Sequence, residues 1–362
     1  SRDWSSDVCS SDLIPGPVSI APEVLAAQAR PMLPYPGLEY EELFRRITER
    51  SRRIFLTENI VMPLALSQPG AQEVMLRNFV SHKLLCCVNG SVSQQWADIA
   101  AALGLETILL ESEWGEPVFP NEFRQALEQT PVEAILLVHV EPSTGVISPL
   151  TELAQMAHEV RSDALLIVDA SSSLGGIAFS SDELGLDVVF AESCQCLALP
   201  PGLTLASVSA RAFERAAANP QRGTAFDLTR FDKLHRPGAF LGIPPLSLLY
   251  ALDTQLDRMI LEGLDNRYQR HTDQSAFLQR WLNNAGFPLI AIDGYQSDTV
   301  LVFKNAFGWN FPDLDQYLLQ RGLRIANGAG MFKDRCFRIA VMGETTQSDC
   351  EALTLALSEY KG

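Results

Sequence analysis

Short apolar segments alternate with helix-forming segments along the middle of the chain. The apolar segments, which we expect to be strands, are 84–88, 107–110, 134–140, 164–169, 187–191 and 203–209. The intervening segments that we expect to be helices are 93–103, 121–129 and 149–160. Strands that are apolar throughout and separated by helices form a mainly parallel sheet with helices on both faces. The sequence therefore predicts an α/β fold, in which ligands bind at the carboxyl ends of the strands.

The segments on either side of this region predict further helices and a second domain. Leu43, Ile47 and Ile54 follow a helical spacing, so we expect a helix over 40–56 and another over 71–80. After the loop-rich stretch 220–245, the expected elements are a helical stretch over 246–285, a strand over 298–303, a helix over 312–321, a strand over 336–341 and a helix over 346–359. We predict a large domain over residues 14–258 and a small C-terminal α+β domain over 259–362.

The first 13 residues, SRDWSSDVCSSDL, are polar and have no periodicity. They resemble the translation of a sequencing-adapter oligonucleotide, so we interpret residues 1–13 as an artefact and leave them out of the fold prediction. The alternative is a genuine disordered N-terminal segment.

Composition excludes several classes of protein. The chain has 362 residues, of which 47% are hydrophobic, enough for a substantial core. No apolar run reaches the roughly 18 residues that a membrane-spanning helix needs. The formal net charge of −16 argues against binding to nucleic acid or to an anionic membrane. The seven cysteines match no disulfide spacing, which favours reduced thiols and a cytoplasmic protein.

Several common catalytic motifs are missing from the sequence. There is no glycine-rich nucleotide loop and no Gly-x-Ser-x-Gly elbow. His139-Val140-Glu141 is similar to part of a zinc-deaminase motif, but Cys194 and Cys196 are too close together for its second half. We therefore predict no metal site. A nucleophilic thiol at Cys194 or Cys196 remains an alternative to simple packing of these side chains.

Several segments together resemble the class V aminotransferases, which are pyridoxal-phosphate enzymes of fold type I. The segments are IPGPVSIAPEVL (14–25), VNG (88–90), EPSTGVISPL (141–150), VDASSSLGG (168–176), SCQCLALPPG (193–202), IPPLSLLYAL (243–252) and FRIAVMG (337–343). The nearest branches by these motifs are alanine–glyoxylate (serine–pyruvate) aminotransferase and 2-aminoethylphosphonate–pyruvate transaminase. The resemblance implies a homodimer with its site at the subunit interface.

The resemblance assigns roles to individual residues. Asp169 takes the position of the carboxylate that pairs with the pyridine nitrogen of the cofactor, and Arg338 that of the arginine that binds the substrate carboxylate. The alternatives are a strand-end Asp that caps a loop and an ordinary strand Arg on a solvated face. The positions implied to contact the cofactor are Asp169, Ser67, Gln68, Val92, Ser143, Thr144, Ser193 and Ile243.

Four contacts that the family makes with its cofactor are altered in this sequence. Gln195 stands where the family has the lysine that forms an imine with the cofactor, and no lysine occurs from 84 to 232. The family's phosphate-binding turn, Ser-Gly followed by His or Thr, is here Ser67-Gln68-Pro69. In this turn Gln68 adds bulk where the backbone should approach the phosphate, and Pro69 has no N–H to donate. Val92, or alternatively Ser91, stands where the family has the aromatic residue that stacks on the cofactor ring. Ile243 replaces the threonine that reaches the phosphate in the partner subunit.

Three functions stay open at this point. The chain is a pseudoenzyme that retains a small-carboxylate pocket at Arg338, or an enzyme that acts on a small amino acid or 2-oxo acid without a lysine, or a transaminase that takes its lysine from elsewhere. If the protein is a pseudoenzyme or a lysine-independent enzyme, it would bind any pyridoxal phosphate without a covalent bond. We expect Asp169 and Gln195 to share one cleft with Val92 and Ser67 nearby. We also expect no lysine to reach this cleft, Lys233 being the only realistic exception.

Overall fold

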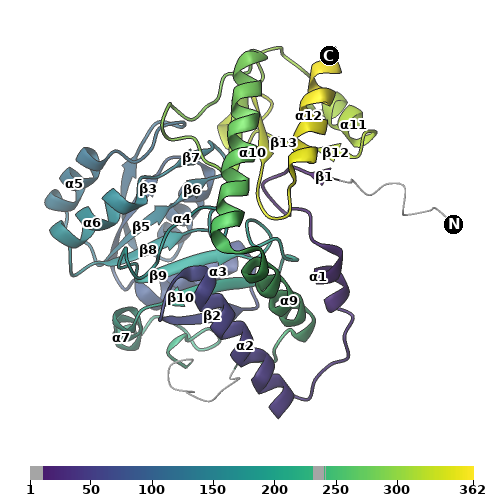
Figure 1. The fold of residues 1–362 in the computed structure, drawn as a ribbon. Helices are drawn as coiled ribbons and strands as arrows, with labels where there is room; N and C mark the ends of the chain where they lie inside the picture. The colour runs from purple at the N-terminus through teal and green to yellow at the C-terminus, as the bar shows by residue number, and fades with distance from the viewer. Residues whose placement is uncertain (1–10, 231–239, 241) are drawn as a thin grey trace.

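A seven-stranded sheet forms the centre of the molecule (Figure 1). The structure is a computed structural model that describes residues 11–230, 240 and 242–362. In spatial order the strands are β2 (Ile60–Leu64), β10 (Thr204–Val208), β9 (Val188–Glu192), β8 (Leu165–Asp169), β5 (Ala134–Val138), β3 (Lys83–Val88) and β4 (Glu106–Glu111). Only β10 in this sheet runs antiparallel to its neighbours, and β9, β8, β5, β3 and β4 pair in parallel. The predicted α/β fold with a mainly parallel sheet is confirmed.

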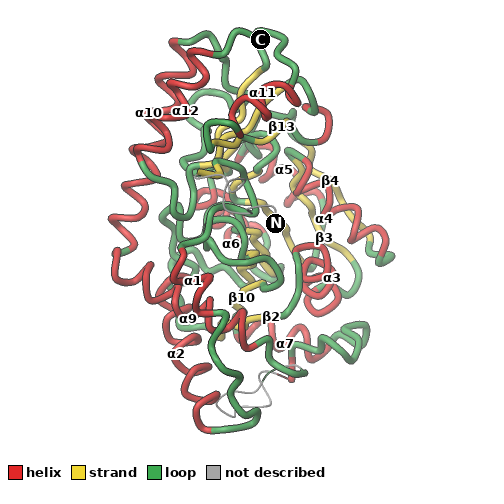
Figure 2. Tube along the Cα trace, turned by 90° about the vertical axis from the view of Figure 1, so that its right-hand side faces the viewer, coloured by secondary structure: helices red, strands yellow, loops and turns green. Residues whose placement is uncertain are grey.

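Helices cover both faces of this sheet. Neighbouring residues of each strand point to opposite sides, and because both are apolar, both faces must be buried. Ile135 and Leu137 pack on one side, while Leu136 and Val138 pack on the other. The first face is covered by α2 (Leu38–Phe55), α5 (Pro120–Gln129), α6 (Leu150–Val160) and α9 (Leu246–Glu262). The second face is covered by α3 (Gln68–Phe79), α4 (Ser91–Ala102) and α7 (Ala210–Ala218). Figure 2 shows the strands between α2 and α9 on one side and α3 and α4 on the other.

The C-terminal part is a smaller α+β unit. Its sheet has the order β11 (Val300–Lys304), β14 (Cys336–Ala340), β13 (Ala326–Asn327), and both pairs are antiparallel. The helices α10 (Leu264–Asn284), α11 (Phe311–Leu319) and α12 (Gln347–Glu359) accompany it. The helical stretch expected over 246–285 is in fact two helices, because Gly263 has a φ of +83°, a conformation that breaks a right-handed helix. The chain passes from the large sheet to the small one at this glycine.

Residues near the N-terminus join the C-terminal unit. The short strand β1 (Ser11–Asp12) pairs in parallel with β12 (Leu323–Arg324). Leu13 is 1% exposed and belongs to the same core as Ile339 and Leu353. Part of the segment that was left out of the fold prediction therefore packs in this unit. After it, α1 (Pro22–Ala27) packs against α9. The remaining short strands, β6 (Val140–Glu141) and β7 (Val146–Ile147), form a hairpin beyond β5.

None of the helices in the described part of the chain has the length and apolar composition needed to span a bilayer.

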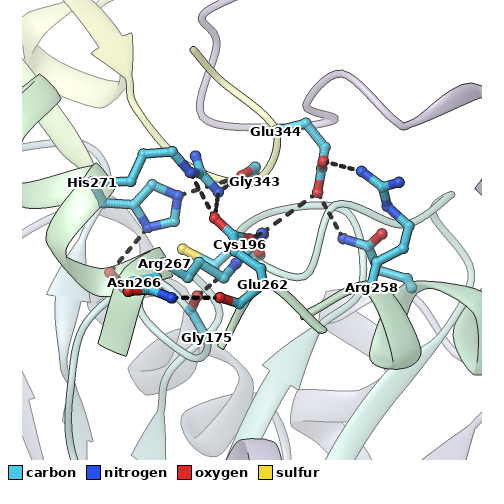
Figure 3. A network of polar contacts seen from close by, with 12 residues as sticks. Gly175, Cys196, Arg258, Glu262, Asn266, Arg267, His271, Gly343 and Glu344 are labelled. Atoms are coloured by element: carbon cyan, nitrogen blue, oxygen red, sulfur yellow. Dashed lines mark hydrogen bonds and ion pairs between the residues drawn. The ribbon is translucent and has the colours of Figure 1, made fainter. Parts of the chain in front are cut away.

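A buried arginine connects α10 to the large sheet (Figure 3). Arg267 is 1% exposed, and its guanidinium donates to the carbonyl oxygens of Gly175 (2.9 Å) and Cys196 (3.3 Å). It also pairs with Glu262 (2.8 Å) and lies 3.5 Å from Glu344. Burial alone would raise the pKa of Glu344, but Arg267, Gln255 and Arg258 outweigh burial and lower it to about 2. The charged network therefore holds two loops of the large sheet against the C-terminal unit.

We expect Arg267→Ala to lower the free energy of unfolding by about 3–5 kcal/mol, because it removes the buried cation between Glu262 and Glu344 and leaves two buried carbonyl oxygens without their donor. Urea unfolding followed by circular dichroism measures this change. The control is Arg77→Ala, which removes an exposed pair with Glu73 on α3 and should cost less than about 1 kcal/mol. Equal losses in the two variants would show that the buried network does not stabilise the fold as argued.

Candidate functional site

The carboxyl ends of β8 and β9 meet the N-termini of α3 and α4 beside a cavity of about 540 Å³. Acidic residues end both strands: Asp169 ends β8 and Glu192 ends β9. Side chains from the large sheet and from the C-terminal unit line the cavity together. Among the lining residues are Gln68, Val92, Glu192, Cys194, Gln195, Asp315, Arg324, Asn327 and Arg338.

Asp169 is fully engaged by protein groups. Its Oδ2 accepts hydrogen bonds from the indole N–H of Trp96 (2.8 Å) and the side-chain amide of Gln68 (3.4 Å). Its Oδ1 accepts the backbone N–H of Ser171 at 3.0 Å. Burial raises the pKa of Asp169, and these hydrogen bonds only partly oppose the rise. Asp169 is not among the described residues that line the cavity, whereas its hydrogen-bond partner Gln68 is.

Gln195 lies in the cavity wall and is held by two neighbours. Its Oε1 accepts the hydroxyl of Ser172 at 2.5 Å, which leaves its amide nitrogen to donate to Glu192 Oε2 at 3.5 Å. The side chain is 7% exposed. An amide has no nucleophilic amine, so this group can neither form an imine nor accept a proton as a general base at neutral pH.

Glu192 is a site residue that the sequence analysis missed. Its Oε1 accepts the backbone N–H of Gln68 at 3.3 Å, so its carboxylate sits at the N-terminus of α3. An anion is favourable there because the first N–H groups of a helix are unsatisfied and carry partial positive charge. Burial raises the pKa of Glu192, and the nearby Asp169 adds to the rise. The available signal was an acidic residue at the end of an otherwise apolar strand, VVFAE.

Trp96 is the second residue that was missed. It is completely buried in α4, where its ring packs edge-on against Phe190 with the centroids 5.5 Å apart. Sequence spacing alone makes such a tryptophan a core residue. Only the approach of α4 to the end of β8 turns its N–H into a partner of Asp169.

The loop 141–144 closes the site near α4. Glu141 is completely buried and accepts the backbone N–H groups of Val92 (3.2 Å) and Ser93 (2.9 Å), so it caps this helix. The hydroxyl of Ser143 donates to Glu141 at 2.7 Å. The hydroxyl of Thr144 is buried and has no hydrogen-bond partner among the described residues.

Arg338 reaches the cavity from β14. Its Nε donates to the carbonyl of Asn327 at 2.7 Å, and Nη1 lies 3.5 Å from the carbonyl of Pro142. Burial lowers the pKa of Arg338, opposed only by the negative charge of Glu141. Within the described part of the chain no carboxylate forms an ion pair with it. By contrast, Arg324 in the same cavity pairs with Asp315 at 3.5 Å.

The other predicted positions lie around the cavity rather than in it. Ser67 is the N-cap residue of α3. The hydroxyl of Ser193 donates to the carbonyl of Pro200 at 2.7 Å. Ile243 is 87% exposed and is not among the described residues that line the cavity. No described lysine lines it either, and Lys233 falls outside the residues that the structure describes.

The neighbouring thiols are poor nucleophiles. Burial raises the pKa of both Cys194 and Cys196 to about 12, so both are protonated at neutral pH. The structure therefore gives no support to a thiolate mechanism.

The residues of this cleft do not fit pyridoxal phosphate in the way that the resemblance implies. The carboxylate meant for the pyridine nitrogen already accepts the N–H groups of Trp96 and Gln68. The carboxylate of Glu192 occupies the N–H of Gln68 and would repel a phosphate. Gln195 offers no amine.

Comparisons with known proteins agree on one family. A sequence model described as Aminotransferase class-V matches residues 85–353. An uncharacterised aminotransferase of Methanocaldococcus jannaschii is 31% identical over 96% of this chain and 91% of its own length. The mouse alanine–glyoxylate aminotransferase is 29% identical over 95% of this chain and 86% of its own length.

Solved structures of two aminotransferases have the same fold as this chain. An aspartate aminotransferase of subgroup IV from Thermus thermophilus superposes with a TM-score of 0.88 at 28% identity, covering 97% of this chain and 98% of that one. An alanine–glyoxylate aminotransferase from Nostoc sp. gives 0.90 at 26% identity, covering 96% and 94%. By the extent of the family match and the identity to its members, the chain belongs to the class V aminotransferases.

Proposed function

We propose that this protein is a class V aminotransferase-family member that does not transaminate and instead binds a small carboxylate in the cleft. The observation that carries the proposal is a continuous series of hydrogen bonds among protein groups. It runs from Trp96 to Asp169, then through Gln68 and Glu192 to Gln195. Each of these groups stands where the family pattern implies a contact with the cofactor or lies next to such a position.

Loss of the lysine removes two separate chemical functions. An imine-forming amine anchors the cofactor, and the same amine moves protons during transamination. A general base alone contributes about 10²–10⁴ in rate. Gln195 supplies neither function. On this proposal the protein has the fold of the family but does not catalyse transamination.

A carboxylate is the ligand that Arg338 favours. Its guanidinium is largely removed from water, and backbone carbonyls accept hydrogen bonds from Nε and Nη1, which leaves Nη2 without a partner in the described part of the chain. A planar guanidinium binds a carboxylate through two parallel hydrogen bonds. A bound carboxylate would supply the negative charge for Arg338 that no described residue supplies through an ion pair.

The second candidate is an active enzyme on a small amino acid or 2-oxo acid. It is favoured by the names of the relatives, among which are alanine–glyoxylate and serine–glyoxylate aminotransferases. It requires a lysine from outside the described cleft, such as Lys233, or a reaction without one.

The experiment that separates the two candidates is cofactor uptake. With added pyridoxal phosphate, we expect the wild-type protein to develop no protein-bound visible absorbance and borohydride to fix no cofactor to the chain. Coupled assays with alanine and glyoxylate should show no turnover above background. A fixed cofactor on Lys233, found by peptide mapping, would establish the second candidate instead.

In the same assays Gln195→Lys should restore weak colour at most. The new ammonium would lie beside Glu192, which favours the charged form and lowers its nucleophilicity. Pro69, Val92 and Trp96 still deny the cofactor its phosphate, stacking and pyridine contacts. The comparison variant combines Gln195→Lys with Glu192→Gly, Pro69→His and Val92→Trp, and it should bind more cofactor. Turnover of the single variant at ordinary enzyme rates would contradict the pseudoenzyme proposal.

We expect Arg338→Gln to weaken the binding of acetate or propionate about 10- to 100-fold, the effect of losing a charge-assisted pair worth roughly 1.5–3 kcal/mol. Isothermal titration calorimetry measures the affinity. Arg324→Gln is the matched control, since that cation lines the same cavity but already has Asp315 as its partner. Similar losses in both variants would argue against a specific site at Arg338.

We further propose a cytoplasmic homodimer. The six described cysteines are free and buried, which suits a compartment that keeps thiols reduced. Ile243, the position that the family directs toward the partner subunit, is 87% exposed in the single chain. Size-exclusion chromatography with light scattering should give twice the mass of one chain, and Ile243→Asp should shift the protein toward the monomer. A monomeric wild-type protein would refute this assembly.

A further inference from the structure

Two ionisable side chains of opposite type, Glu192 and Arg338, line the same cavity without ion-pair partners in the described part of the chain. Glu192 is 8% exposed and comes from the end of β9. Arg338 comes from β14 in the C-terminal unit and is partly buried. Both side chains line the cavity of about 540 Å³. A buried charge is costly unless an opposite charge or strong hydrogen bonds compensate it.

The hydrogen bonds to Glu192 are long. Its oxygens accept the N–H of Gln68 at 3.3 Å and the amide of Gln195 at 3.5 Å, and both distances exceed those of well-formed hydrogen bonds. The neighbouring thiol of Cys194 is a further donor, and all three donors are neutral. Gln195 cannot turn its oxygen toward another group at no cost, because Ser172 holds that atom at 2.5 Å. The carboxylate of Glu192 therefore retains capacity for a cationic donor on its cavity side.

We propose that the cleft binds a small amino acid as an intact zwitterion, with its ammonium on Glu192 and its carboxylate on Arg338. This inference rests on the proposed function, from which it takes the carboxylate site. An ammonium offers three donors and forms short, charge-assisted hydrogen bonds with a carboxylate. Binding would compensate both buried charges at once. The subsite at Glu192 would also discriminate against phosphate-bearing ligands, which carry the wrong sign of charge.

The separation of the two charges in the ligand decides which amino acid fits. The test therefore uses a series in which that separation grows: glycine, β-alanine and γ-aminobutyrate. Each is paired with the acid that lacks the amine, namely acetate, propionate and butyrate. The full-length protein is titrated with each compound by calorimetry, without added cofactor.

For at least one pair, the amino acid should bind about 10- to 100-fold more tightly than its matched acid, the usual effect of a buried charge-assisted bond. Glu192→Gln should abolish this preference and should not weaken the binding of the acid, because the variant removes a negative charge from the cavity. That variant keeps an oxygen for the N–H of Gln68, and urea unfolding checks that it is folded. Asp315→Asn is the control, because that acid lines the cavity but is paired with Arg324.

The possible failures are distinguishable. Acids that bind as tightly as their amino acids, or a preference that survives Glu192→Gln, would overturn the ammonium subsite and leave the carboxylate site at Arg338 standing. Covalent uptake of pyridoxal phosphate with turnover would overturn the proposed function itself. Absence of binding throughout both series would overturn both.

Discussion

The position of Arg267 inside the fold is the constraint on which the site depends. Its guanidinium binds the carbonyl of Gly175 in the loop after β8 and the carbonyl of Cys196 in the loop after β9. These loops carry Ser172 and Gln195, whose side chains meet at 2.5 Å. Because Arg267 belongs to α10, the C-terminal unit fixes the spacing of two loops of the large sheet. The same unit brings Arg338 to the cavity from β14.

The cleft has two ends that differ in how far the protein satisfies its own groups. At the inner end, Asp169 accepts three hydrogen bonds from Trp96, Gln68 and Ser171. At the outer end, among the residues that the structure describes, Arg338 has backbone carbonyls as its hydrogen-bond partners, and the donors to Glu192 are all neutral. The inner end is therefore part of the core, and the outer end remains suited to a ligand. This difference is the physical basis for the proposal that the protein has the family's fold without transaminating.

Sequence patterns predicted the sheet well, because a buried parallel strand and a surface helix have different and regular apolar spacing. They failed at Gly263, where a single residue with a positive φ splits a stretch that is helical on both sides. They also led to Leu13 being left out, since a polar segment with one buried leucine has no periodicity. The resemblance identified Asp169, Gln195 and Arg338 as positions of interest. Glu192 and Trp96 escaped notice because their importance comes from the meeting of β9, α3 and α4, which no local pattern contains.

The hydrogen bond between Trp96 and Asp169 has a consequence for any molecule that competes for this carboxylate. An intramolecular donor is present at an effective concentration set by the fold, which for short connections is in the millimolar range or above. Here the donor is held rigidly in a helix and packed on Phe190, so no ordering entropy is lost when the bond forms. A free ligand whose ring carries an N–H must displace the indole, and its binding also costs translational and rotational entropy. The indole therefore acts as a permanent competitive occupant of the carboxylate, independent of the solution around the protein.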